Sequence, residues 1–249
     1  AFSGMESLTS VTFDTEGLTE IGEYAFQKCT ALKSIEIPAG VKKIKAYAFS
    51  GCASLSSIIL PDSLTELGTV QARKNYADKG YTFSDCISLK EMDLPDGITY
   101  IGPYTFQNAG LVTVKLPLSI KFLTINKLLP SKSATSAKLR NFTYNTSTSA
   151  IYAAGQFANC ANLETVILPA GLQAIGKQVF ENTPKLKTVT YDGANIEDGS
   201  CLPANMQEIC ANAFLNSGLE NLKILGIKTI YKGAFNNANI KVVDIGACN

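Results

Sequence analysis

The chain has 249 residues, of which 46% are hydrophobic and 17% are charged, and its formal net charge is +1. This length suits one large domain or a repeat array, and the near-neutral charge gives no field that would attract nucleic acid or an anionic membrane. The sequence has no histidine and no tryptophan, which excludes nucleophiles activated by histidine and every metal site that needs histidine.

A triplet of apolar residues recurs along the chain, formed by a Leu or Ile and the apolar residues three and five positions later. Side chains alternate in a strand, so each triplet predicts a short β-strand with two residues facing the core. One copy, Leu139-Phe142-Tyr144, is degenerate, and counting it the chain is expected to form about ten coils of about 23 residues. The other copies are Leu8-Val11-Phe13, Leu32-Ile35-Ile37, Leu55-Ile58-Leu60, Leu89-Met92-Leu94, Leu111-Val114-Leu116, Leu163-Val166-Leu168, Leu186-Val189-Tyr191, Leu219-Leu222-Ile224 and Ile240-Val243-Ile245.

A second column runs in phase with the triplets, because an Ala-Phe or similar pair precedes most of them. An Ile or Leu lies five residues before most of these phenylalanines, and a proline follows the strand in five copies. The near-helical spacing of Ile44, Ala48, Cys52 and Leu55 predicts a short helix or 3-10 turn on an outer wall. The phenylalanines of the pairs are Phe26, Phe49, Phe83, Phe106, Phe157, Phe180, Phe214 and Phe235.

No single coil can bury its own apolar stripe, so the coils are expected to stack on one another. The sequence therefore predicts a leucine-rich-repeat solenoid of α/β class over residues 1–249. The solenoid is expected to be curved and right-handed, with a parallel inner β-sheet. The first coil starts at Ala1-Phe2, in the middle of a repeat, so we expect either that the natural protein extends N-terminally or that a partner covers an end.

Three spacings exceed the period and predict insertions near residues 69–80, 124–150 and 194–201. Such insertions leave a solenoid as loops and often carry recognition, although a tolerated surface insertion is the simpler interpretation. The first contains Arg73 and Tyr76. The second contains Lys127, Lys132 and Lys138 within a basic stretch that could meet acidic glycans or proteins.

The motif Ile-Gly-x-x-Ala-Phe-x-x-Cys-x-x-Leu-x-x-Ile-x-Ile-Pro, which spans Ile21 to Pro38, resembles the BspA-type leucine-rich repeat. The resemblance covers essentially the whole chain, and the sequence lacks the asparagine column that follows the strand in commoner leucine-rich repeats. It implies a surface or secreted protein of a host-associated bacterium, with adhesion to host matrix proteins or other cells. No site residue is carried over from the family.

Four of the seven cysteines, Cys29, Cys52, Cys86 and Cys160, occupy one repeat column three residues after the phenylalanine. Other copies place Ala, Ser or Thr there, which favours packed free thiols. The sequence also allows disulfides between adjacent coils, since neighbouring strands lie within the Cα range that a disulfide can bridge. Cys201 and Cys210 could pair locally.

The exposed positions of the inner sheet carry small polar residues and scattered charges, among them Glu91, Asp93 and Lys115. Glu91 and Asp93 would lie about 7 Å apart on one open strand. Paired carboxylates at such spacing serve some glycosidases, but no pocket is implied here, so we expect a solvated surface and no catalysis.

These observations predict a non-catalytic binding or adhesion scaffold, secreted or at the cell surface, with no cofactor and no metal. The expected partners are host or bacterial surface proteins, including extracellular matrix. Nucleic-acid binding and membrane insertion of this chain are not expected. The alternative is a glycan-associated binding module or a non-catalytic domain of a larger surface enzyme.

Overall fold

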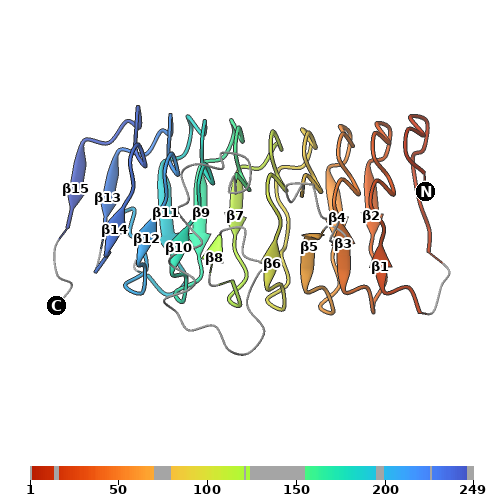
Figure 1. Cartoon of the computed structure of the whole chain (residues 1–249). Coiled ribbons are helices and arrows are strands. Elements are labelled where there is room, and N and C mark those ends of the chain that lie inside the picture. The colour runs from red at the N-terminus through yellow and green to blue at the C-terminus, as the bar shows by residue number, and fades with distance from the viewer. Residues whose placement is uncertain are drawn as a thin grey trace, which may run out of the picture.

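The structure is a computed structural model, and it describes residues 2–13, 17–69, 80–120, 122–123, 155–194, 199–224 and 226–245. These residues form parallel strands and tight turns and contain no helix. The chain winds as a stack of flattened coils from one end of the molecule to the other (Figure 1). Each regular coil runs through two strands and two corners, so the solenoid has two walls.

The leucine wall contains the strands of the predicted triplets. Each strand from β2 to β13 buries the middle residue of its triplet, whereas Val243 of the terminal strand β15 is 43% exposed. Partners in neighbouring coils lie in register, as Val114, Val166 and Val189 do across three coils. These findings confirm the parallel sheet predicted from the alternation. The strands are β2 (Ser34–Glu36), β4 (Ser57–Ile59), β7 (Thr113–Lys115), β9 (Thr165–Leu168), β11 (Thr188–Tyr191), β13 (Asn221–Lys223) and β15 (Val242–Asp244).

The isoleucine wall is a second parallel ladder, built around the Ile or Leu five residues before most corner phenylalanines. Its strands pair in register from Ile21 through Ile44 and Leu67 to Ile101, and again from Leu123 to Ile230. The strands are β1 (Glu20–Ile21), β3 (Lys43–Lys45), β5 (Glu66–Thr69), β6 (Tyr100–Ile101), β8 (Phe122–Leu123), β10 (Ala174–Ile175), β12 (Glu208–Ile209) and β14 (Thr229–Ile230).

The prediction of a helix or 3-10 turn on the outer wall was wrong. The chain instead turns through a phenylalanine corner, defined as the Phe of each coil with the two residues on either side. Backbone amides at this corner bond to the next coil, as Phe26 N–H does to the Ala48 carbonyl at 2.7 Å (donor to acceptor) and Phe49 N–H to Thr82 at 2.9 Å. Because these amides are satisfied between coils, the segment has no need of bonds within a helix.

Two residues per corner adopt left-handed backbone conformations, at the positions two before and two after the phenylalanine. In one coil these are Tyr24 (φ 60°) and Lys28 (φ 59°), and in another Gln178 (φ 61°) and Asn182 (φ 56°). A helix cannot continue through such residues. The apparent 3.6-residue spacing therefore came from two bends and not from helical turns.

A ladder of stacked phenylalanine rings forms the centre of the core. The rings run through nine coils with neighbouring centroids 5.2 to 5.7 Å apart. Phe106 stacks directly on Phe157 at 5.3 Å, and Thr113 of β7 pairs with Thr165 of β9. No coil lies between these two, so the prediction of about ten coils was wrong for the described residues, whose phenylalanine ladder has nine members. The triplet Leu139-Phe142-Tyr144 lies outside the described residues.

The proline corner closes the other side of each coil, where β-turns join the two walls. The carbonyl of the proline accepts a bond from the amide three residues later, as from Val41 to Pro38 at 3.3 Å and from Leu64 to Pro61 at 3.0 Å. Proline has no amide hydrogen to donate to the ladder, which explains why it follows the triplet in five of the copies.

The third insertion places an additional segment in the leucine wall. Residues 200–202 lie between β11 and β13, because the Cys201 amide bonds to the Val189 carbonyl at 2.8 Å and the Lys223 amide bonds to the Ser200 carbonyl at 2.8 Å. The Ser200 hydroxyl also accepts from Val189 N–H. Residues 200–202, at the end of an insertion that was predicted to be a loop, are therefore part of the leucine wall.

Candidate binding surfaces

The leucine wall presents few side chains that could anchor a partner. Glu91 and Asp93 are exposed on either side of buried Met92, in a segment that forms no strand. The Lys115 Nζ lies 3.3 Å from an Asp192 carboxylate oxygen, and both side chains are largely exposed. Such an exposed pair is weak and is screened by salt. Sequence reasoning missed it because Asp192 follows β11, outside the alternating positions.

The first two insertions interrupt their coils at the same point, directly after a strand of the isoleucine wall. Residues 70–79 follow β5, and the chain returns at Gly80, whose carbonyl accepts from Tyr47 N–H at 2.9 Å. Residues 124–154 follow β8, and the chain returns at Gly155, whose amide donates to the Lys177 carbonyl at 3.0 Å. A single uninterrupted strand, β6, separates the two interrupted coils on the isoleucine wall.

Packing at one of these roots is close. A Cβ at Gly80 would lie 2.2 Å from the Pro103 carbonyl oxygen, so only glycine allows the returning chain to meet its neighbour. The candidate residues Arg73, Tyr76, Lys127, Lys132 and Lys138 lie outside the described residues.

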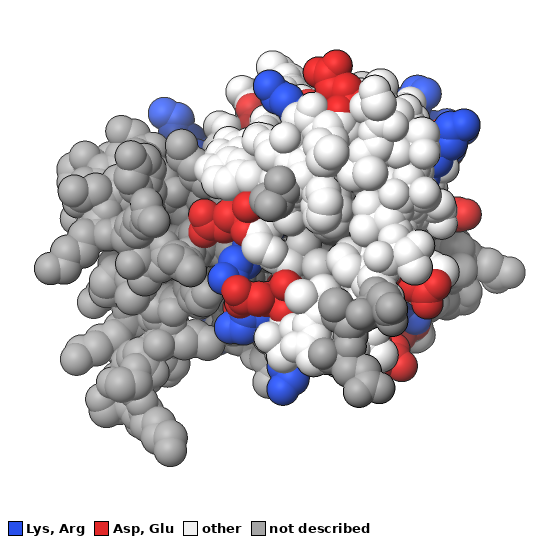
Figure 2. All heavy atoms as spheres, turned by 90° about the vertical axis from the view of Figure 1, so that its right-hand side faces the viewer, with Lys and Arg blue, Asp and Glu red and all other residues white. Residues whose placement is uncertain are grey.

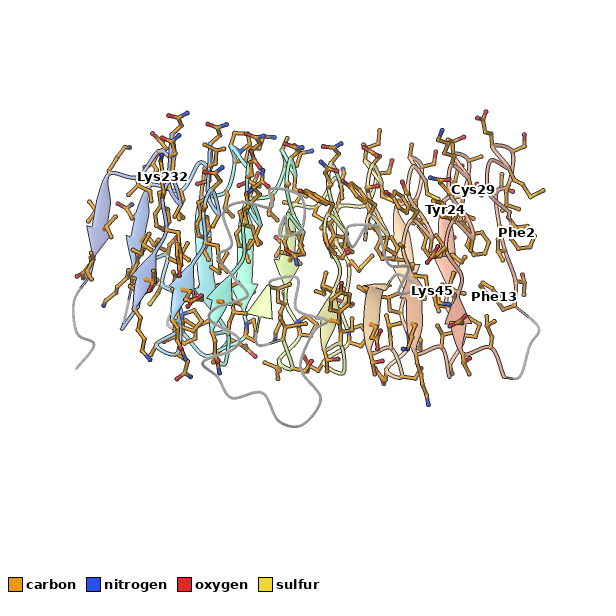
Figure 3. The ribbon with its side chains drawn as sticks, viewed as in Figure 1. Phe2, Phe13, Tyr24, Cys29, Lys45 and Lys232 are labelled. Carbon is orange, nitrogen blue, oxygen red and sulfur yellow. The ribbon has the colours of Figure 1, made fainter. Side chains whose placement is uncertain are left out.

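A ridge of four tyrosines, Tyr24, Tyr47, Tyr81 and Tyr104, runs along the phenylalanine corner beside these roots. The rings stack nearly parallel, with centroids 4.9, 5.1 and 4.9 Å apart. Tyr24 is 42% exposed and the other three are half-buried. Figure 3 shows Tyr24 near Cys29 and Phe2 at the N-terminal end of the solenoid. We call this row the tyrosine ridge.

All four tyrosines have left-handed backbone conformations, with φ between 44° and 60°. Bulky residues rarely adopt this conformation. The same column in the later coils contains Gly155, Gln178, Asn212 and Gly233, also at positive φ. The tyrosines are therefore not required by the turn, since residues better suited to its backbone occupy the rest of the column.

The ridge ends at Gly155, where a Cβ would lie 2.4 Å from the Tyr104 ring. Desolvation raises the pKa of Tyr47 to about 12, helped by the neighbouring Tyr81 and Tyr24. Burial also raises the pKa of Tyr81 and that of Tyr104. The phenols of Tyr47, Tyr81 and Tyr104 are therefore neutral hydrogen-bonding groups at physiological pH.

Sequence reasoning missed the ridge, although a signal was present. The first four complete corners each read Tyr-x-Phe, at Tyr24, Tyr47, Tyr81 and Tyr104. The Ala-Phe pair predicts the core and draws attention away from the tyrosine two residues before the phenylalanine.

An asparagine ladder lies on the opposite side of the same corner, two residues after the phenylalanine. The Asn182 amide donates to the Asn159 side-chain oxygen at 2.8 Å, and Asn216 donates to Asn182 at 2.6 Å. Asn108 donates to Asp85 at 2.8 Å in the same column. The ladder holds the left-handed corners in register, and it occupies a different column from the one that follows the strand in commoner leucine-rich repeats.

The cysteine column is buried, as predicted. Cys29, Cys52, Cys86 and Cys160 are free thiols, and each donates to the carbonyl of the phenylalanine in the preceding coil, at 3.0 to 3.3 Å. Desolvation raises the pKa of Cys52 and that of Cys160 to about 12. The column is structural, since a thiolate nucleophile or ligand needs a lowered pKa.

The described residues contain no cluster of acidic or thiol side chains that could hold a metal ion. Nor do they contain a helix long and apolar enough to cross a membrane. Seen from the N-terminal end of the solenoid, the described surface is mainly uncharged, with Lys, Arg, Asp and Glu toward its margins (Figure 2). Phe2 and Met5 of the first coil are about half exposed, at 46% and 50%.

The sequence profile of the BspA-type leucine-rich repeat region, with six copies, matches residues 1–75, 79–199 and 191–248. The chain belongs to the BspA-type leucine-rich repeat family. Family membership agrees with the parallel strands and the repeated corner, and it confirms the resemblance inferred from the motif. No curated protein matches the chain significantly in sequence.

Solved leucine-rich repeat proteins share the fold at low sequence identity. A protein from Bacteroides ovatus is 20% identical, with a TM-score of 0.56, and the match covers 95% of this chain and 62% of that one. A protein from Eubacterium ventriosum is 21% identical, with a TM-score of 0.62, over 90% of this chain and 47% of that one. The Treponema pallidum leucine-rich repeat protein is 23% identical, with a TM-score of 0.52, over 82% and 72%. This chain thus spans less than two thirds of the length of the first and second of these structures.

Proposed function

We propose that this chain is a non-catalytic binding and adhesion scaffold, secreted or displayed at a cell surface, which recognises host matrix proteins or other surface proteins. The observation that carries the proposal is the common origin of the first two insertions. Both begin where a strand of the isoleucine wall ends, one at β5 and the other at β8, and among the described strands of that wall only β6 lies between them in coil order.

The common origin supports one shared recognition surface. Arg73 and Tyr76 belong to the first insertion, and Lys127, Lys132 and Lys138 belong to the second. Aromatic and arginine side chains supply most of the affinity at protein interfaces, while lysines steer an acidic partner toward them. A partner that meets one root is within reach of the other and of the tyrosine ridge.

The leucine wall supports the proposal less well. Its exposed charges are scattered and include Glu36, Glu91 and Asp93, and Lys115 is already paired with Asp192. In the described strands of this wall, no aromatic side chain lies at the exposed alternating positions, so the wall offers little area for an anchor. We propose that it is a solvated surface.

Membership of the BspA-type family supports a location outside the cell. The buried free thiols of the cysteine column are compatible with that location. Buried thiols with raised pKa values react slowly with oxidants. The cysteine column would therefore persist without disulfides in an oxidising environment.

The test is to probe arrays of matrix proteins, bacterial surface proteins and glycans with the purified chain. We expect saturable binding to at least one protein and no hydrolysis of the bound ligand. Binding to glycans with none to proteins would overturn the proposal in favour of a glycan-associated module.

A further inference from the structure

We propose that the tyrosine ridge binds a proline-rich segment of a partner, in the polyproline II conformation, laid along the corner. This inference rests on the proposed scaffold function, because it names the chemistry of one ligand that such a scaffold would hold. It does not depend on the insertions themselves.

Ring stacking determines which part of each tyrosine a ligand can reach. Neighbouring rings lie about 5 Å apart and within 9° to 18° of parallel. The ring faces between Tyr24 and Tyr104 therefore cover one another, and the ridge displays ring edges and hydroxyls. A sugar ring or a cation that needs a free aromatic face is disfavoured, whereas a ligand that packs on edges and accepts hydrogen bonds is favoured.

The hydroxyls of the ridge supply the hydrogen bonds. The pKa of Tyr47 lies at about 12, so its phenol remains protonated and can donate. Among the described residues, no hydrogen bond engages the hydroxyls of these four tyrosines. A polyproline II segment has no internal hydrogen bonds, and its carbonyls face outward. A proline-rich segment is thus a row of free acceptors with few donors, complementary to a row of phenols.

The spacing of the rings agrees with the period of such a segment. Two successive steps of 5.1 and 4.9 Å span about 10 Å. One turn of polyproline II has three residues and rises about 9.3 Å. Every third residue of the ligand would therefore lie over every second tyrosine. An extended β-strand repeats every two residues, at about 6.6 Å. This repeat does not match the ring spacing of 4.9 to 5.1 Å, so a strand would lose its register with the tyrosines after one ring.

The ridge is also rigid before a ligand arrives. Each inner ring is fixed between two neighbours, and the backbone beneath it is held by bonds between coils, as from Tyr47 N–H to the Gly80 carbonyl at 2.9 Å. Tyrosines that are already ordered lose little conformational freedom on binding. Aromatic rows and proline-rich segments recur as partners for the same reason, since the segment too is ordered in advance.

The test measures binding of decaproline to the full chain by NMR titration, with a glycine-serine peptide of equal length as the control ligand. The key variant replaces Tyr47 and Tyr81 with Asn, which suits the left-handed turn, as Asn212 shows in the same column (φ 58°). The matched control is Gln178→Asn, in the same column beyond the ridge. A Tyr47→Phe variant keeps the ring and removes one hydroxyl.

We expect saturable binding of decaproline, no binding of the glycine-serine peptide, and unchanged binding in Gln178→Asn. The double variant should lose at least ten-fold in affinity, and Tyr47→Phe should lose several-fold. Absence of decaproline binding by the wild-type chain, or equal binding by the folded double variant, overturns the inference. The scaffold function is tested separately, because a protein ligand found on the arrays would stand even if decaproline does not bind.

Discussion

At the scale of single residues, the fold depends on columns in which one residue type repeats from coil to coil. Phe49 is fully buried between Phe26 and Phe83, at centroid distances of 5.2 and 5.4 Å. Replacing it with Ala removes both stacks and leaves a cavity, so we expect a loss of about 3–5 kcal/mol in the free energy of unfolding. Chemical denaturation measures the loss. Ile59→Ala is the control, since Ile59 is 58% exposed and should change stability by less than about 0.5 kcal/mol.

The thiol column makes a prediction about pH. The pKa of Cys52 and that of Cys160 are raised from 9.0 to about 12 by burial. A folded-state pKa above the unfolded value means that stability is complete below pH 9 and falls as pH rises toward 12. We expect native thiols to resist labelling at pH 8 and to react after denaturation. Rapid native labelling of Cys52 and Cys160 would show that the column is not shielded.

At the scale of elements, the corners were harder to predict than the strands. The leucine-wall strands follow from their alternation, because a period of two is visible within one repeat. The isoleucine wall was missed because strands such as Lys43–Lys45 contain one buried residue between polar neighbours, too short to show a period. The left-handed corner was mistaken for a helix because Ile44, Ala48 and Cys52 all point inward, whatever the backbone between them.

The candidate binding residues were predictable only in part. The insertions could be located from the lengthened spacings, but their common origin on the isoleucine wall could not, since that wall was unknown. The Tyr24 column was visible in the sequence, yet stacking between coils is needed to recognise it as a continuous surface. The roles of Arg73 and Lys132 in binding a partner stay predictions.

The asparagine ladder gives a test of the corner. Asn182 combines a left-handed backbone (φ 56°) with bonds to Asn159 and Asn216. Asn182→Ala loses the bonds and strains the backbone by about 1–2 kcal/mol, whereas Asn182→Gly loses only the bonds. We expect the Gly variant to melt at a higher temperature than the Ala variant, the reverse of the usual order in helices. A helical corner would give the usual order.

At the scale of the whole molecule, the repeated residues build one continuous core, and the insertions make the surface of some coils different from that of others. The phenylalanine ladder continues past both long insertions without a break, from Phe49 to Phe83 and from Phe106 to Phe157. Added residues therefore leave the stack intact, so the insertions can vary in length and sequence without disrupting the fold. We expect the insertions to be removable one at a time while unfolding remains cooperative.

The measurement that tests the account most directly is the affinity of a protein partner for variants with trimmed insertions. Residues 128–136 are replaced by a short Gly-Ser turn, and the dissociation constant is measured by surface plasmon resonance at low and high salt. We predict weaker binding and a smaller salt dependence, because Lys132 is removed and fewer charges remain to be screened. Unchanged affinity after trimming both insertions, together with loss on replacing Glu91, Asp93 or Lys115 with Ala, would contradict the account and place the site on the leucine wall.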